Sequence, residues 1–532
     1  MSDQTLPNPT PVTPANAPRS VSASIRGWLL PLAVIVVTSL MVFLFTSVVD
    51  FALSVTEVSF WRTLFLSDGS SVSGDVGNLA EVLIGVLGLT LTVVAIVVQL
   101  ASQRYTPKLI DLFLADRVTV VTFLGMVFAS VYCIWIIYSI RNHYTPVFGS
   151  LVLIAITTVM LALLIPYFRY VFQFLTPTNI LETIERNFMA AVKQAGSANG
   201  GGLERQKHAV INNIEQVTDI ALSAVTQVDR NVSLLSINTL ASILSSYIEA
   251  KRALPATWYR PRSEHFISIS AEFFDDISDR RVWVEARGLM DLELIFTQSL
   301  KNMPDAVSAI ATNTRQVALA ALAHDDDESA YLCIEYFNTF LRRAINDKNQ
   351  RAVFSLLYQY RRMAEAMLER RLNLAEEIAG FFKYYGNETL RVGMPFLMVV
   401  AAMDISTLLQ RGYALGVSPL EPILENFLQM GHLPELEKVG FAHKGVTKAH
   451  MILATHLLAQ DGDSPTLHRI RDSLLRHSQQ WLRETRDELL GVTKQKFWEI
   501  TDRGGINFEY LEPEMKTWLN RFCDDYLTTA SA

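Results

Sequence analysis

Four long apolar tracts constrain this chain more than any other feature. They cover residues 27–49, 82–103, 118–140 and 144–168, and none of them contains Asp, Glu, Lys or Arg. About 20 apolar residues in an α-helix are enough to cross the ~30 Å hydrocarbon core of a bilayer. The pattern therefore predicts a helical protein that crosses the lipid bilayer four times.

The charged residues lie mainly beyond the fourth tract. The first 175 residues carry eight basic and eight acidic side chains, so the net charge of −7 belongs to the remainder, which reads as a large water-facing domain. A mildly acidic domain lacks the clustered positive charge that nonspecific nucleic-acid binding requires, and no nucleic-acid partner is expected. Cys133, Cys333 and Cys523 are far apart and in no CxxC spacing, which argues against a disulfide framework or a zinc ribbon.

Basic residues near the tracts predict the orientation, because Lys and Arg are retained on the cytoplasmic side. The connection between the second and third tracts holds Arg104, Lys108 and Arg117. The connection between the first and second holds Arg62 among five acidic residues, and Arg141 is the one basic residue on the opposite side after the third tract. Both termini are therefore expected in the cytoplasm.

The sequence suggests four regions in an all-α chain. Residues 1–26 contain five prolines and read as a disordered cytoplasmic tail, and the first tract reads as a retained anchor. A four-helix membrane domain is expected over 27–175, and a juxtamembrane helix with a glycine-rich linker over 176–202. Residues 203–532 read as a cytosolic domain of stacked helical hairpins, like an α-solenoid.

Details of this helical domain follow from local patterns. Asn179 and Glu182 form a capping-box pattern that would begin the juxtamembrane helix. Amphipathic helices are expected near 305–323, 328–346, 349–371, 373–386 and 389–412. The apolar patch 392–403 is too short to cross a membrane and predicts a buried helix. No repeat with fixed residues is found.

The second tract carries a stripe of small and polar residues. Its members recur at alternating steps of four and three and so share one helix face: Glu81, Gly85, Gly88, Thr92, Ala95, Gln99 and Ser102. The stripe is either a face on which another helix packs closely or the lining of a water-filled path in a homo-oligomer, with Glu81 as a charged ring at the outer mouth. Glu81 and Asp50 would then lie near the outer interface, where we expect solvated carboxylates.

Chemistry is otherwise sparse. No phosphate-binding loop, dinucleotide fingerprint, nucleophile elbow or zincin motif is present, so no catalytic residue, cofactor or metal is predicted. The acidic run 324–328 fits a helix start, and His450 and His456 do not share a helix face as metal ligands would. The aromatic segment 497–510 reads as a structural turn, and Trp258 as a loop anchor. No charge lies at mid-bilayer, which argues against a proton-coupled carrier.

One segment resembles a known family. The run 101–109, Ala-Ser-Gln-Arg-Tyr-Thr-Pro-Lys-Leu, and then Phe113-Leu-Ala-Asp-Arg117 are similar to bacterial predicted integral-membrane proteins of domain-of-unknown-function family 2254. A weaker similarity runs from Ala221 to Thr239, where the Pro-Gly and Asn-Asp-Pro elements of the family are missing. The resemblance covers about residues 80–240 and implies a bacterial inner-membrane protein without implying an activity.

Two functions remain open at this point. The first is a homo-oligomeric channel whose second span lines the pore and whose cytosolic helices regulate it. The second is a membrane-anchored scaffold whose cytosolic helices recruit a protein partner. The polar stripe favours the channel, because a plain anchor would not require it.

Overall fold

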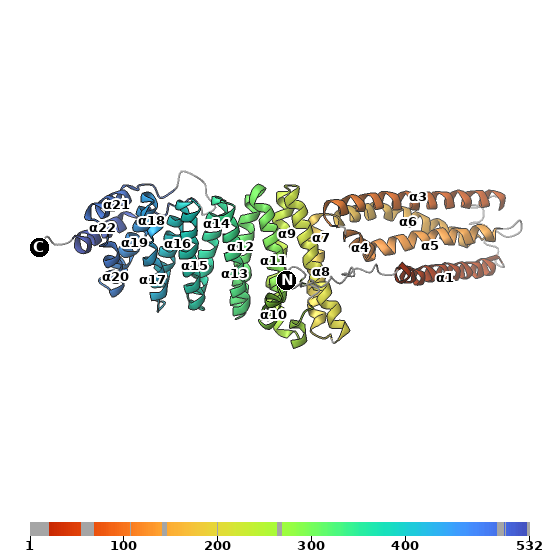
Figure 1. Cartoon of the computed structure of the whole chain (residues 1–532). Helices are drawn as coiled ribbons and strands as arrows, with labels where there is room; N and C mark the ends of the chain where they lie inside the picture. Colours follow the sequence, from red (N-terminus) through yellow and green to blue (C-terminus); the bar gives the residue numbers. More distant parts are fainter. Residues whose placement is uncertain are drawn as a thin grey trace, which may run out of the picture. The chain divides into compact units, whose positions relative to one another are not determined.

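The computed structural model describes residues 21–54, 69–106, 108–140, 146–198, 200–262, 266, 269–496, 505 and 507–528. These residues are mostly helical and include no extended strand. They fall into two compact units, Met1–Thr176 and Pro177–Ala532. Figure 1 shows the long helices of the first unit and the stacked helices of the second. The expected all-α class is confirmed.

The first unit is a bundle of four long helices. They are α1 (Val21–Ser54), α3 (Gly69–Arg104), α5 (Arg117–Ser139) and α6 (Val147–Phe174), with the short α4 (Leu109–Leu114) between α3 and α5. Each contains most of one predicted apolar tract. Their apolar windows have mean hydropathies of 2.3 to 2.6 and are only 22 to 33% buried. Such exposed apolar surface is suited to lipid.

Helix α5 lies at the centre of this bundle, since it packs against α1, α3 and α6. Its side chains Tyr132, Cys133 and Ile136 are fully buried and meet Val76 of α3 and Leu153 of α6. These five side chains form a small hydrophobic core within the bundle.

A fifth helix is also apolar and long enough to cross a membrane, over Arg230–Ala253. It belongs to the second unit, where it packs against neighbouring helices, and its apolar window is 61% buried. Burial against protein accounts for its composition, whereas the four bundle helices leave most of their apolar surface uncovered.

The second unit is built from two layers of helices. One layer follows the order α9 (Arg230–Ala250), α12 (Pro304–Ala323), α14 (Gln350–Met367), α16 (Pro395–Ala414), α19 (Gly440–Asp461) and α22 (Pro513–Phe522). The other follows α8 (Gly201–Thr226), α11 (Trp283–Asn302), α13 (Asp327–Asn346), α15 (Leu372–Arg391) and α17 (Glu421–Met430). Each helix packs on the next in its layer, which confirms the solenoid-like arrangement.

The remaining helices fill the ends and connections of this array. They are α7 (Pro177–Ala195), α10 (Ala271–Asp279), α18 (Pro434–Glu437), α20 (Pro465–Leu474) and α21 (Gln479–Gly491), with short turns η1 (Lys251–Ala253), η2 (Ala256–Tyr259) and η4 (Cys523–Leu527). Helix α7 packs on α8 and α9, so it belongs to this unit, and the glycine-rich segment after it connects two helices that touch.

The connections between the layers repeat in backbone geometry although their residues differ. Three of them place a non-glycine residue in the left-handed region, at Val228 (φ 56), Asp325 (φ 51) and Lys348 (φ 52). The next residue in each case is an N-cap whose side chain accepts a backbone N–H from the new helix: Asp229, Asp326 and Asn349. What repeats is therefore the backbone conformation of the turn and not the identity of its residues. Because several residue types can adopt this conformation, the sequence shows no repeat with fixed residues.

Most expected helix positions are confirmed, with two differences. The prediction of one helix over 389–412 is wrong, because two helices meet within that range. Helix α15 ends at Arg391, Gly393 adopts a left-handed conformation (φ 83), and α16 begins at Pro395. Helix α7 begins at Pro177, so Asn179 lies within its first turn and is not the residue before it. Residues 395–403 of the apolar patch lie in α16 and are mostly buried, as expected.

Candidate functional site

The α3 stripe faces away from the other helices of its own bundle. Six of its residues are exposed: Glu81, Gly85, Gly88, Thr92, Ala95 and Gln99. Ser102, at the end of the stripe, is buried. The opposite face of α3, with Leu83, Thr90, Val94 and Val98, is buried against the bundle. Within one copy, therefore, no described helix covers the central part of the stripe.

The stripe leaves open space above its glycines, and the Thr92 hydroxyl already has a hydrogen-bond acceptor. A Cβ added to Gly85 or Gly88 would meet no other atom within 4 Å. Thr92 donates its hydroxyl hydrogen to the Gly88 carbonyl at 2.8 Å, a bond within the helix. Small residues at this spacing allow two helix backbones to approach closely in a membrane. The stripe thus offers an open face to a helix from outside this bundle.

Asp50 is the charged residue that the structure places differently from expectation. It lies near the end of α1, is 8% exposed, and accepts backbone N–H groups from Phe148 at 2.7 Å and Gly149 at 3.0 Å. Those amides belong to the first turn of α6, where a helix has unpaired donors and the positive end of its dipole. The prediction of a solvated carboxylate is wrong for Asp50, because α6 supplies the partners that water would have supplied.

Further hydrogen bonds join α1, α5 and α6. Tyr132 of α5 donates to the Gly149 carbonyl at 3.2 Å, and its hydroxyl lies 3.2 Å from Thr46 Oγ1 of α1. These groups are buried, so each bond also avoids the cost of an unsatisfied polar atom in an apolar environment. Asp50 stood out in the sequence as a charge at the end of a tract, but nothing marked Tyr132 or Gly149 as its neighbours.

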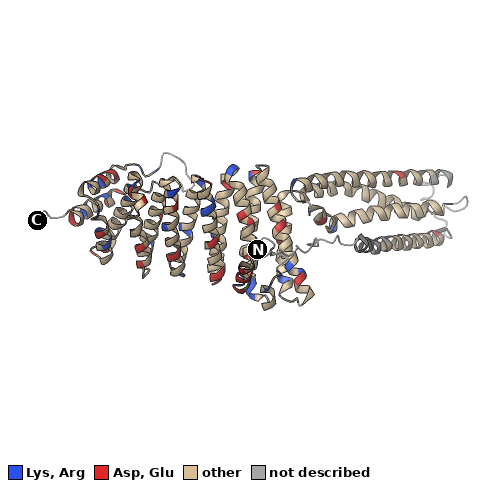
Figure 2. Ribbon diagram, in the orientation of Figure 1, with Lys and Arg blue, Asp and Glu red and all other residues tan. Residues whose placement is uncertain are grey.

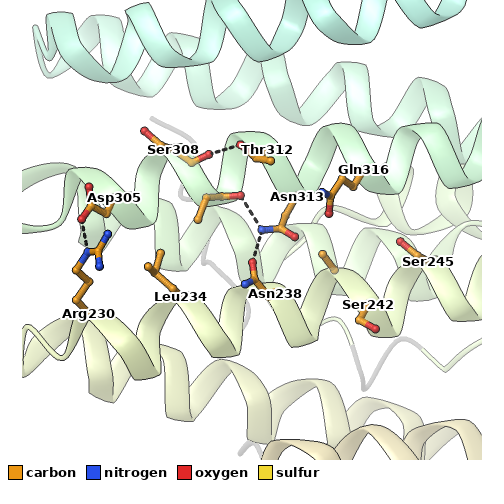
Figure 3. Close-up of a pocket in the computed structure, with 12 residues that line it drawn as sticks. Arg230, Leu234, Asn238, Ser242, Ser245, Asp305, Ser308, Thr312, Asn313 and Gln316 are labelled. Atoms are coloured by element: carbon orange, nitrogen blue, oxygen red, sulfur yellow. Dashed lines mark hydrogen bonds and ion pairs between the residues drawn. The ribbon is translucent and has the colours of Figure 1, made fainter. Parts of the chain in front are cut away.

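The second unit holds a polar groove between α9 and α12, shown in Figure 3. Its volume is about 680 Å³ and it is open to solvent. Hydroxyl and amide side chains dominate the lining, from Asn238, Ser242 and Ser245 on α9 and from Ser308, Thr312, Asn313 and Gln316 on α12. At one end Arg230 pairs with Asp305.

Some of the polar side chains in this groove already form hydrogen bonds within the protein. Asn313 donates to Asn238 Oδ1 at 2.8 Å and to the Ala309 carbonyl at 2.9 Å. Ser242 donates to Glu185 of α7 at 2.6 Å. The exposed side chains of Asn238 and Gln316 remain beside the open space. Apart from the Arg230–Asp305 pair at one end, the groove therefore presents uncharged donors and acceptors, of the kind that match peptide groups or other neutral polar ligands.

The acidic run 324–328 is used for helix capping and ion pairs. Asp326 caps α13 and lies 2.5 Å from Lys251, which also contacts the fully buried Glu285 at 2.6 Å. Asp325 and Asp327 both pair with Arg371. These contacts account for the run as part of the packing between helix pairs.

Other residues singled out from the sequence lie apart from these features. His450 is buried in α19, with its Nε2 3.1 Å from the Phe427 carbonyl, and burial lowers its pKa to about 4. Trp258 is fully buried and donates to Tyr247 at 2.9 Å, as expected of a loop anchor. Of the aromatic segment 497–510, Trp498 lies outside the described residues, and Tyr510 donates to Glu512.

With this geometry in place, the chain is a multi-pass helical membrane protein joined to a large helical domain. Residues 26–241 match the model of a family described as "Predicted membrane protein (DUF2254)". This match confirms the resemblance seen in residues 80–240, extends it to all four bundle helices, and ends within α9.

The other comparisons add little. A search of curated proteins finds no match. A solved structure described as "Circular tandem repeat protein with novel repeat topology and enhanced subunit contact surfaces" is similar at 13% identity over 84% of this chain and 96% of that chain, with a TM-score of 0.29. At this TM-score the likeness carries no conclusion.

Proposed function

We propose that this protein is a homo-oligomeric channel of the bacterial inner membrane in which α3 of each copy lines the path. The observation that supports the proposal is the exposed face of α3, from Glu81 to Gln99, which no described helix of the same copy covers. Uncovered glycine and threonine on a bilayer helix gain from packing against another helix or from contact with pore water. Copies arranged around a common axis would provide both.

The proposal includes an orientation. The basic residues Arg104, Lys108 and Arg117 support a cytoplasmic α3–α5 connection, and with it cytoplasmic termini. Glu81 would then stand at the outer mouth and Gln99 near the inner one. The second unit, which carries most of the charged residues in Figure 2, would be cytosolic and would regulate the path.

The two-layer helical array favours a second candidate, a membrane-anchored scaffold. Arrays of this kind present long surfaces to protein partners, and the groove between α9 and α12 is one such surface. In that case the bundle would only hold the array at the membrane, and the α3 stripe would be a contact between copies without a conducting path.

The test begins with the oligomeric state of the full-length protein in detergent, measured by mass photometry, followed by conductance of the same sample in a planar bilayer. Thr92→Trp would fill the exposed face, and Val93→Trp is its matched control. Val93 is 36% exposed on the same helix beside Thr92, but it points about 100° around the helix axis from Thr92 and so lies off the stripe. Both variants add the same side chain to the lipid-exposed surface of α3.

A ring-sized oligomer whose conductance changes with Thr92→Trp but not with Val93→Trp supports the channel. A silent monomer or dimer rejects it. A third outcome is that the wild type assembles but does not conduct, and that Thr92→Trp prevents assembly. This outcome identifies the stripe as a packing face and favours the scaffold.

A further inference from the structure

A second groove of the helical array is lined by arginines. It opens between α12, α14, α16 and α19, has a volume of about 710 Å³, and is open to solvent. Arg315, Arg361, Arg362 and Arg411 line it, together with the acidic residues Glu365 and Glu369. Such a concentration of guanidinium groups is unexpected in a unit whose overall charge is negative.

Two of these arginines are neutralised by the protein itself. Arg361 is largely buried and pairs with Asp404 of α16 at 3.0 Å and with Glu365. The same Glu365 is 3.2 Å from Arg362, so one carboxylate serves two guanidinium groups. Arg362 is 52% exposed and keeps donors that face the groove.

The other two have no acidic partner among the described residues. Arg315 is half-buried and donates to Gln359, a neutral acceptor, at 2.8 Å. Burial and the nearby positive charge of Arg362 both lower the pKa of Arg315. Arg411 is exposed on α16 and lines the groove without an ion pair.

We infer that this groove binds an acidic peptide segment, whose carboxylates pair with Arg315, Arg362 and Arg411. Arginine presents a rigid fork of donors that matches a carboxylate with two parallel hydrogen bonds. An incoming carboxylate would relieve the repulsion between Arg315 and Arg362 and so gains more here than at a lone surface arginine. The inference does not depend on whether α3 conducts.

The neighbouring groove explains why a peptide fits better than a small anion. Gln316 lines the polar groove between α9 and α12, and the preceding residue, Arg315, lines the arginine groove. The two grooves therefore follow consecutive helices of one layer. The main-chain groups of an extended peptide can form hydrogen bonds with Asn238 and Gln316, and its acidic side chains can pair with the arginines. A phosphate ion would occupy only part of one groove.

The test measures binding of a fluorescently labelled eight-residue peptide of alternating Glu and Ser to the full-length protein in detergent, by fluorescence polarisation. The ionic strength is about 0.15 M, where weak nonspecific attraction is screened. The double variant Arg315→Gln with Arg411→Gln removes the two unpaired cations. Arg205→Gln is the matched control, because Arg205 is exposed on α8 outside the groove.

We expect saturable binding that weakens at least about tenfold in the double variant, the equivalent of ~1.4 kcal/mol, and stays unchanged in Arg205→Gln. A peptide of alternating Lys and Ser should not bind. The inference is overturned if the acidic peptide does not bind saturably, if both variants bind it equally, or if inorganic phosphate displaces it as effectively as unlabelled peptide. Unchanged melting of the double variant shows that a loss of binding is not a loss of folding.

Discussion

The carboxylate of Asp50, in α1, accepts the backbone N–H of Gly149, in the first turn of α6, at 3.0 Å. The Phe148 N–H donates to the other oxygen of the same carboxylate at 2.7 Å. One helix thus provides the N-terminal cap of another helix 99 residues later in the chain. An ionised cap in a buried position stabilises through both hydrogen bonding and the helix dipole.

Asp50→Asn should destabilise the bundle. The amide keeps one acceptor oxygen but loses the charge and one of the two bonds, so we expect a loss of about 1 to 3 kcal/mol and a lower melting temperature in detergent. Glu81→Gln is the control, since Glu81 is exposed on α3. Equal melting temperatures for the two variants would show that the cap contributes nothing measurable.

Gly149→Ala tests how closely α5 and α6 approach. The added Cβ would lie 2.9 Å from Ile136 Cδ1, closer than carbon atoms normally pack. We expect a cost of about 1 to 3 kcal/mol from this overpacking, measured as a drop in thermal stability. The double variant with Ile136→Val removes the clashing methyl group and should recover much of the loss. Failure to recover would locate the strain elsewhere.

Crosslinking tests whether copies meet through α3. Cys133, Cys333 and Cys523 are all buried, so an introduced surface cysteine should dominate the reaction. Ala95→Cys, on the stripe, should give covalent oligomers with a bifunctional maleimide, seen on a denaturing gel. Leu100→Cys, 61% exposed on another side of the same helix, should remain mainly monomeric. The reverse pattern would place the contact off the stripe.

Asp291 should make stability depend on pH. It is buried in α11 and accepts from Thr218 at 2.9 Å, and burial raises its pKa to about 6. Since an unfolded aspartate titrates near ~3.9, the stabilising contribution of the protonated form is complete below about pH 4 and is lost as pH rises through about 6. Asp291→Asn does not titrate.

We therefore expect the stability of Asp291→Asn, relative to the wild type, to rise by about 2 to 3 kcal/mol between pH 4 and 7. Thermal melting of both proteins across this range measures the difference. A difference that is constant with pH would mean that Asp291 does not titrate in this interval.

Val228→Gly should stabilise the helical unit. Val228 is 57% exposed, and its φ of 56 is a conformation that strains a β-branched residue by about 1 to 2 kcal/mol. Glycine removes this strain but adds freedom to the unfolded chain, so the net gain should be about 0.5 to 1 kcal/mol. Gln227→Gly, at a φ of −84, should give no gain. Denaturant titration of both variants measures their free energies of unfolding. A larger free energy of unfolding for Gln227→Gly than for Val228→Gly would contradict the prediction.

Sequence alone determined the features that depend on neighbouring residues. The four apolar helices follow from length and composition, and the α3 stripe follows from the 3.6-residue period, because a residue's place on a helix face depends only on its spacing. The helices α12 and α13 were predictable for the same reason. The end of α15 was missed, because the left-handed turn at Gly393 interrupts an otherwise continuous helical pattern.

Only the tertiary structure decided which faces meet. It turned the α3 stripe away from its own bundle, gave Asp50 a partner in α6, and brought Arg315, Arg362 and Arg411 from three helices to one groove. Asp50 and Gly149 are 99 residues apart, and Arg361 and Asp404 are 43 apart. Nothing in the local sequence specifies such pairs, because their proximity comes from the packing of whole helices, which balances burial over the entire unit.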